Sequence, residues 1–171
     1  MIMKNWIPVP GSIKAKILEQ AVKEFCSKGY QGVHVKNLSE TVGVTTGAIY
    51  HHFNSKVNLY AIVREEMERR IVDRMEGAAA VFDDPTKSIR TAILVGFDSA
   101  IKFGACRLLS ENDPSQGPDR IADFLSTIQV DGAQGLAYIL PAAWRSALLS
   151  VLEERLSVEE ARSVLEWLLT K

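Results

Sequence analysis

Three histidines have the chemistry that would suit a metal site or proton transfer: His34, His51 and His52. Two of them are adjacent in the segment TTGAIYHHFNSK, residues 45–56. Neighbouring residues of a helix point about 100° apart, whereas metal ligands on one helix stand at positions i and i+4. No carboxylate cluster or catalytic motif accompanies the histidines. We therefore expect no metal site, no cofactor and no enzymatic activity.

The segment that holds the paired histidines has two contrasting faces when it is drawn as a helix. One face consists of Thr46, Gly47, Tyr50 and His51, and the other of Ala48, Ile49, His52 and Phe53. The second face is apolar apart from His52, so it is expected to pack on the preceding helices. The first face is polar on an element of only two turns, which suits entry into a groove.

A second short helix is predicted just before this segment, at residues 36–42, and Gly43 ends it. Three residues then separate the two helices. A helix, a short turn and a short polar helix are typical of the helix-turn-helix that reads the major groove of DNA. A plain helical hairpin is the alternative interpretation of this spacing.

The rest of the chain also has a helical period, so the predicted fold class is all-α with about eight or nine helices. Further helices are expected at residues 13–29, 55–76, 85–104, 121–128 and 136–156, with Pro141 kinking or interrupting the last of these. Residues 110–119, SENDPSQGPD, are expected to form a loop. Ser157 and Glu160 predict a capping box that opens the final helix.

Composition and charge agree with a DNA-binding head on a soluble body. Of the 171 residues, 47% are hydrophobic and 24% charged. No apolar run approaches the roughly 20 residues of a membrane-spanning helix, and the N-terminus lacks the apolar core of a signal peptide, so a cytoplasmic protein is expected. Residues 1–60 contain seven lysines and three glutamates, a balance of +4, whereas the remainder has 13 basic and 18 acidic residues, a balance of −5. A basic first third suits contact with a polyanion.

Residues 13–60 resemble the N-terminal DNA-binding domain of the TetR family of bacterial transcriptional regulators. The motifs "F..KGY" and "GV..GAIYHHF.SK", together with the spacing between them, carry the resemblance. It implies a three-helix domain at residues 1–55 and a helical effector-binding and dimerisation domain at 56–171. It further implies a homodimer that binds double-stranded DNA at a palindromic operator and is released by a small apolar or amphipathic effector.

The resemblance also implies roles for individual residues near the turn. Thr46, Gly47 and Tyr50 match the positions that meet bases and nearby phosphates, and Lys36 matches a basic position that reaches a guanine edge. His51, His52 and Lys56 match positions that touch the DNA backbone. For His52 this disagrees with the helical projection, which leaves packing in the core as an alternative.

One position departs from the family pattern. Where the family usually has a pair of hydroxyl residues before the second helix, this chain has Val33 and His34. The hydroxyl cap is therefore missing, and our hypothesis is that His34 donates to a phosphate instead. If so, DNA affinity should rise as the pH falls from about 8 to 6.

The second domain contains candidate residues for a ligand pocket and for a dimer interface. The expected ligand pocket is lined by Phe97, Asp98, Phe103, Phe124, Tyr138 and Trp144. An exposed ion pair between Asp98 and Lys102 and an ordinary aromatic core are the alternatives. The four-helix dimer interface that the resemblance implies is expected to use Leu140, Trp144, Leu148, Val151, Leu165, Leu168 and Leu169.

Two other functions fit the same sequence. One is a DNA-binding protein of architectural or occlusion type that responds to no ligand. The other is a ligand-binding dimer whose helix-turn-helix is vestigial. The positive balance of residues 1–60 and the presence of Tyr50 and Lys56 count against the second.

Overall fold

The computed structural model describes residues 9–130 and 135–170, and within these ranges it is built from nine α-helices and no strand. This confirms the predicted all-α class. The helices are α1 (Ile13–Gly32), α2 (Val35–Val42), α3 (Thr46–Phe53), α4 (Lys56–Ala79), α5 (Pro85–Lys102), α6 (Cys106–Ser110), α7 (Arg120–Thr127), α8 (Leu136–Leu152) and α9 (Val158–Leu168).

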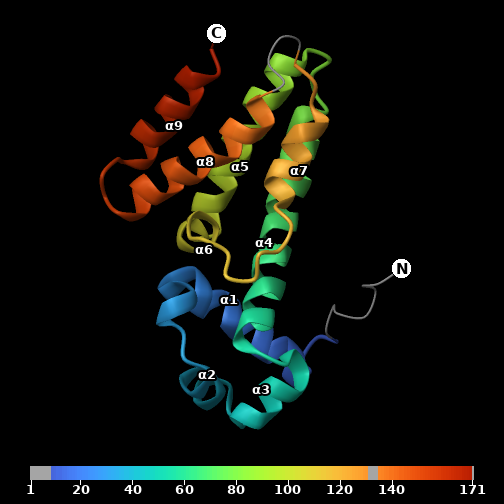
Figure 1. The fold of residues 1–171 in the computed structure, drawn as a ribbon, viewed down its shortest axis with the longest axis vertical. Coiled ribbons are helices and arrows are strands. Elements are labelled where there is room, and N and C mark those ends of the chain that lie inside the picture. The colour runs from blue at the N-terminus through green and yellow to red at the C-terminus, as the bar shows by residue number, and fades with distance from the viewer. Residues whose placement is uncertain (1–8, 131–134, 171) are drawn as a thin grey trace.

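Helices α1 to α3 form one end of an elongated molecule, and α4 runs from them into the other helices (Figure 1). Ser55 caps α4, because its hydroxyl accepts the N–H of Asn58 at 3.0 Å. The domain boundary predicted after residue 55 falls at this cap. We use "body" below for the helices α4 to α9.

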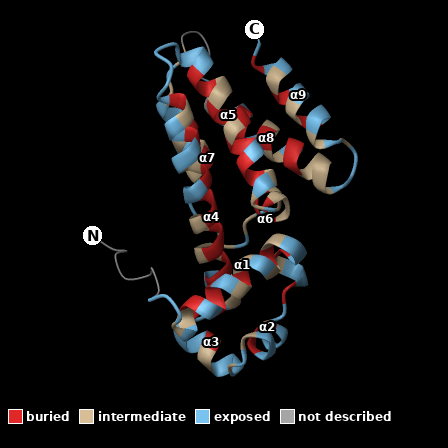
Figure 2. Cartoon of the chain, turned by 180° about the vertical axis from the view of Figure 1, so that it is seen from behind, coloured by how far each residue is buried: buried red, intermediate tan, exposed pale blue. Residues whose placement is uncertain are grey.

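The body is organised around α4, which packs along α5 on one side and meets α7 on another. Helix α8 lies against α6 and α7, and α9 packs on α8 and α5 at the outer edge (Figure 1). Buried residues recur along α4, α5 and α8 (Figure 2). One hydrophobic cluster includes residues from Ile17 in α1 to Leu169 after α9. No helix in the described ranges has both the length and the apolar character needed to cross a membrane.

The helix termini have the capping residues that the sequence indicates. Asp84 accepts the N–H groups of Thr86 and Lys87 at the start of α5, where Pro85 occupies the first turn. The capping box predicted for the last helix is confirmed, since Ser157 and Glu160 exchange both hydrogen bonds.

Three elements differ from the sequence-based prediction. Helix α1 does not end at Gly29 but continues to Gly32 after a break, where Gly29 adopts φ 69° and ψ 179°. Helix α6 was not predicted, because five residues are too few to display a helical period. Helix α8 is not interrupted at Pro141 and ends at Leu152, short of residue 156. Pro141 lies early in α8, where the lost amide removes only the hydrogen bond to residue 137.

Candidate nucleic-acid interface

A glycine turn sets the angle between α2 and α3. Gly43 adopts the left-handed conformation, with φ 76° and ψ 36°, which glycine reaches without a steric penalty. The N–H of Val44 then reaches back to the carbonyl of Ser39 at 2.9 Å. Thr45 starts α3 by accepting the N–H of Ala48 at 3.1 Å. The turn is therefore fixed by local hydrogen bonds on both sides.

Apolar side chains anchor the two helices to the rest of the domain. Leu38 of α2, together with Ile49 and Phe53 of α3, is almost completely buried. These residues belong to the same hydrophobic cluster as Ile17 and Phe25 of α1. Because α3 is only eight residues long, this packing and not intrinsic helix propensity holds it in place.

The opposite face of α3 is exposed to solvent along its whole length. Its exposed residues are Thr46, Gly47, Tyr50, His51 and His52. The Tyr50 side chain is 46% exposed, which is high for an aromatic residue. The structure thus brings together on one helix the five α3 residues for which DNA contact was predicted.

The sequence left two interpretations of His52 open, contact with the DNA backbone and packing in the core. The structure places it among the exposed residues, so the hypothesis that it packs in the core is wrong. Ile49 and Phe53 define the centre of the buried face, and His52 stands about 80° away from that centre on a regular helix. Its ring lies beside that of His51, with 5.5 Å between the ring centroids.

The start of α2 carries the other two predicted contacts. Lys36 is exposed in the first turn. His34 is the N-cap residue, and its side chain makes no capping hydrogen bond. The start of α2 therefore lacks a side-chain cap in the structure, as the sequence indicated. The first N–H groups of α2 have no partner within the helix and point toward the space in front of it.

Lys56, the remaining predicted contact, lies beside α1 at the start of α4. Its Nζ stands 4.3 Å from the centre of the Tyr30 ring, a cation–π contact between α4 and the end of α1. Burial lowers the pKa of Lys56, and the nearby Glu111 carboxylate opposes that shift. The contact with Tyr30 was not predicted from the sequence.

The six residues of the expected ligand pocket differ widely in how far they are buried. Phe97 and Trp144 are fully buried in the core, whereas Tyr138 is 83% exposed. Phe103 lies under the guanidinium of Arg74, and Phe124 is half-buried against the core. Asp98 is exposed and accepts two hydrogen bonds from Nε of Arg162 in α9, at 3.1 and 3.2 Å. The alternative pairing of Asp98 with Lys102 is not the one observed.

The residues expected at the dimer interface also differ in how far they are buried. Five of them are buried within the single chain: Leu140, Trp144, Leu148, Leu165 and Leu169. They pack α8 and α9 on the body, because both helices need an apolar face to join the core. Val151 is half-buried, and Leu168 is 48% exposed. The large apolar side chains exposed on α8 and α9 are Tyr138, Ile139, Val164, Trp167 and Leu168.

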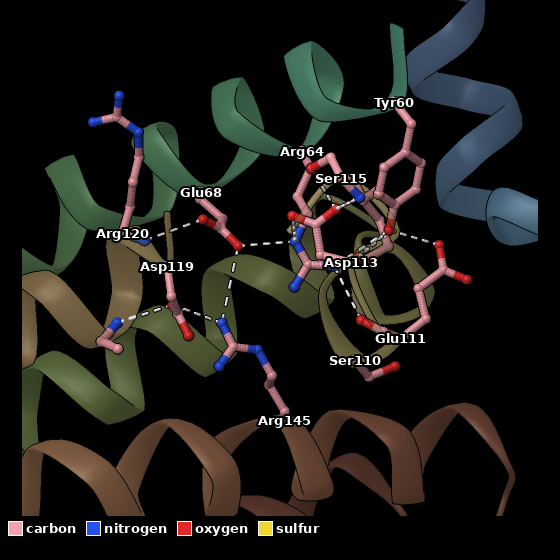
Figure 3. Close-up of polar contacts among 12 residues, drawn as sticks. Tyr60, Arg64, Glu68, Ser110, Glu111, Asp113, Ser115, Asp119, Arg120 and Arg145 are labelled. Atoms are coloured by element: carbon pink, nitrogen blue, oxygen red, sulfur yellow. Dashed lines mark hydrogen bonds and ion pairs between the residues drawn. The ribbon is translucent and has the colours of Figure 1, made fainter. Parts of the chain in front are cut away.

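Sequence reasoning missed a polar network inside the body, between α4, α6 and α8 (Figure 3). Tyr60, Arg64 and Glu68 follow one another on α4 at intervals of four residues, and all three are buried. Arg64 donates through Nε to Glu68 at 3.1 Å and through a terminal nitrogen to the hydroxyl of Tyr60 at 3.2 Å. The i, i+4 spacing of polar residues beside an apolar stripe was the available signal.

Burial and ion pairing shift the pKa values of residues in this network. Burial raises the pKa of the Tyr60 hydroxyl and of the Glu68 carboxyl. Burial also disfavours the charged form of Arg64, but Glu68 and Tyr60 outweigh it, so that the pKa of Arg64 is raised. The pKa of Asp119 is lowered: burial acts in the opposite direction, but the hydrogen bond from Arg145 at 2.8 Å and the N–H of Ala122 outweigh it.

The helix-turn-helix sequence is similar to that of known bacterial regulators. Residues 17–63 match the family described as bacterial regulatory proteins, tetR family. Over 57 residues, 33% of this chain, the sequence is 47% identical to the HTH-type transcriptional repressor AcnR of Corynebacterium diphtheriae. That match spans 30% of the repressor's length.

Solved structures extend the likeness to nearly the whole chain at the level of the fold. A TetR-like transcriptional regulator from Rhodococcus sp. RHA1 superposes with a TM-score of 0.70 at 17% identity, covering 95% of this chain and 96% of the other. The transcriptional regulator FadR from Bacillus subtilis, in complex with stearoyl-CoA, gives a TM-score of 0.71 at 16% identity, covering 91% and 97%. The helix-turn-helix of this chain, at residues 17–63, is therefore similar to that of the tetR family of bacterial regulatory proteins, and the whole chain has the fold of solved TetR-like regulators.

Proposed function

We propose that this protein is a transcriptional regulator that binds a palindromic DNA operator as a homodimer and represses until a small effector releases it. The observation that carries the proposal is the exposed face of α3, where Thr46, Gly47 and Tyr50 stand on a helix anchored from behind by Ile49 and Phe53. A helix presented in this way fits the major groove, where side chains distinguish base pairs by their hydrogen-bonding edges.

The residues around α3 have suitable chemistry for the phosphate backbone. Lys36 is exposed in the first turn of α2, where the leading N–H groups have no side-chain cap, and together they suit an anion such as a phosphate. His51 and His52 extend the surface at the end of α3. We propose that Thr46, Gly47, Tyr50 and Lys36 contact bases and adjacent phosphates, and that His34, His51, His52 and Lys56 contact the backbone.

The outer surface of α8 and α9 supports the homodimer. A groove between these helices is lined by the small residues Ala143, Ser146, Ala147, Ser150 and Ala161 and by Leu156, Val164, Leu165 and Leu168. Trp167, 66% exposed, and Leu168 stand on the same helix, α9. Small residues let helices approach closely, and a two-fold axis through this face would place two α3 helices on one side of the DNA.

We place effector binding in the body, and propose an amphipathic molecule. Its interior contains both apolar side chains, such as Phe97 and Trp144, and the buried charges of Arg64 and Glu68. The indole N–H of Trp144 is buried and has no hydrogen-bond partner among the described residues, so a ligand acceptor there would satisfy this donor. FadR of Bacillus subtilis, which shares the fold, was solved with stearoyl-CoA.

The experiment that tests the function is selection of bound DNA from a random pool at two salt concentrations, with the full chain. We expect a two-fold symmetric motif from the wild type, with affinity that falls steeply as salt rises. Tyr50→Ala should lose the motif, whereas Phe82→Ala, which removes an exposed aromatic side chain from the connection between α4 and α5, should keep it. No motif from the wild type, or a motif that survives Tyr50→Ala, would reject sequence-specific reading by α3.

A further inference from the structure

The carboxylate of Glu111 joins the helix-turn-helix end of the molecule to the body. Its Oε1 accepts the backbone N–H of Tyr30 at 3.0 Å and the hydroxyl of Tyr60 at 2.8 Å. Tyr30 follows the break at Gly29 in α1, where the regular helical hydrogen bonding stops. Glu111 therefore acts as a capping residue for the last turn of α1, although it lies 81 positions further along the chain.

Helix α6 holds the end of α1 at a second point. Nε of Arg107, in the first turn of α6, donates to the carbonyl of Ser27 at 3.1 Å. Arg107 and Glu111, the residue that follows α6, therefore hold α1 on both sides of Gly29. Arg64 of α4 fixes α6 in turn. One terminal nitrogen of its guanidinium donates to the carbonyls of Leu108 at 2.9 Å and Glu111 at 3.0 Å.

A series of ion pairs continues these contacts from α4 to α8 (Figure 3). Arg64 pairs with Glu68 at 3.1 Å, and Glu68 lies 3.9 Å from Arg145 of α8. Arg145 also pairs with Asp119, the N-cap of α7, at 2.8 Å. We call the residues Tyr60, Arg64, Glu68, Glu111, Asp119 and Arg145 the interdomain network.

Burial restrains the centre of this network, at Arg64 and Glu68. Arg64 is 6% exposed and Glu68 2%, so neither charge can exchange its partner for water. Apolar contacts between the two parts tolerate sliding, because the hydrophobic effect has no direction. Hydrogen bonds weaken steeply when their angles change. A shift of α8 therefore has to rearrange the pairs along α4 or move α6, which holds α1.

We propose that Glu111 is a positioning residue that sets the orientation of the helix-turn-helix domain on the body, and that Arg145, Glu68 and Arg64 transmit displacements of α8 to it. The inference rests on the proposed function for its biological meaning. The mechanical link itself is a property of the free protein, which allows the two to be tested separately.

The first test measures hydrogen–deuterium exchange of backbone amides in the full chain without DNA. Glu111→Ala should accelerate exchange at Tyr30 about ten- to a hundredfold, since it removes the charged acceptor of that N–H. Glu111→Gln keeps an acceptor and should fall between this variant and the wild type. Asp123→Ala, which removes an exposed carboxylate from α7, is the matched control and should leave Tyr30 unchanged.

Transmission is tested at the far end of the network. Arg145→Ala should also accelerate exchange at Tyr30, several-fold, although the two residues make no contact with each other. Amides in the middle of α5 report global opening and should stay protected in every variant. Unchanged exchange at Tyr30 in Glu111→Ala, or a response to Glu111→Ala but none to Arg145→Ala, would overturn the proposal.

The second test repeats the DNA selection with Glu111→Ala. Because α3 is untouched, the base preference within each half-site should persist, while the distribution of spacings between half-sites should broaden. A uniform loss of binding with unchanged spacing would show that Glu111 only stabilises the fold and would overturn its positioning role. If the wild type itself selects no motif, the proposed function fails, and the exchange measurements alone decide the mechanical link.

Discussion

A Cβ atom placed on Gly29 would lie 2.6 Å from Oε2 of Glu111. The same position would approach Cδ of Arg107 to 3.1 Å, and the backbone of Gly29 has φ +69°. Two independent constraints therefore require glycine here: a backbone conformation that other residues rarely adopt, and close contact with α6.

Gly29→Ala should consequently lower the free energy of unfolding by more than the roughly 1–3 kcal/mol of backbone strain alone. Gly43→Ala is the matched control, because Gly43 has φ +76° but no atom within 4 Å of the added Cβ. The free energy of unfolding of Gly43→Ala should fall by about 1–2 kcal/mol. Urea unfolding of both variants measures the difference. Equal losses would mean that α6 yields to the methyl group at no detectable energy.

His34→Ser should stabilise the protein by about 0.5–2 kcal/mol, because a hydroxyl at this N-cap can accept an N–H of α2 that now has no side-chain partner. Thermal unfolding measures the gain. Ser12→Ala is the reciprocal control, since Ser12 already caps α1 through the N–H of Ala15 and its loss should be of similar size. No gain in His34→Ser would indicate that solvent or another group already satisfies the start of α2.

His34 also bears on the dependence of DNA binding on pH. If its imidazole donates to a phosphate, operator affinity should increase about tenfold or less between pH 8 and pH 6, and His34→Ser should abolish the increase. Fluorescence anisotropy of labelled operator DNA across this range measures the effect. His51→Gln is needed beside it, because that imidazole is also exposed on the surface proposed to face DNA. A flat wild-type curve would contradict the hypothesis.

The helix-turn-helix was predictable because its signals are local. Gly43 ends α2, Thr45 caps α3, and the apolar spacing of Ile49 and Phe53 orients it, all within fifteen residues. The misplacement of His52 shows the limit of an ideal projection. On a two-turn helix only residues at the centre of the apolar face are reliably buried, and those at its margin follow the packing of neighbouring helices.

The body was predictable only in outline, because its details depend on contacts distant in sequence. The pairing of Asp98 with Arg162 joins residues 64 positions apart, and the bond from Tyr30 to Glu111 spans 81. Likewise, an apolar stripe on α8 or α9 indicates a buried face but not whether the covering surface is the same chain or a second copy. Trp144 and Leu148 were therefore assigned to a dimer interface although they are completely buried in the core.

The lowered pKa of Asp119 predicts where its contribution to stability disappears. A carboxyl whose pKa is lower in the folded than in the unfolded state stabilises the fold above its unfolded value, near pH 4, and loses that contribution as the pH falls through the folded value. Asp119→Asn should therefore be less stable than the wild type at pH 7. The difference should shrink steadily below about pH 4.

Asparagine keeps an acceptor for the N–H of Ala122, so this variant removes mainly the charge that faces Arg145. Urea unfolding at a series of pH values between 7 and 2.5 measures the difference. Asp123→Asn, an exposed carboxyl on the same helix, should show no comparable trend. A difference that persists unchanged at low pH would mean that the side-chain hydrogen bond, and not the charge, is the source of the stability.

Trp167 is the side chain whose replacement should most directly prevent dimer formation. It is 66% exposed on α9 and directly precedes Leu168, one of the residues that line the groove between α8 and α9. Buried aromatic residues dominate the binding energy of such interfaces, and a carboxylate there would lose its hydration on association. Trp167→Glu should therefore raise the dissociation constant of the dimer about 30-fold or more. Sedimentation velocity over a series of concentrations measures the constant.

Val81→Glu introduces the same charge at an apolar side chain that is 74% exposed near the end of α4, and it should leave self-association unchanged. If both variants associate as the wild type does, the second copy does not bind this face, and the two α3 helices would have to be brought to the DNA by another surface.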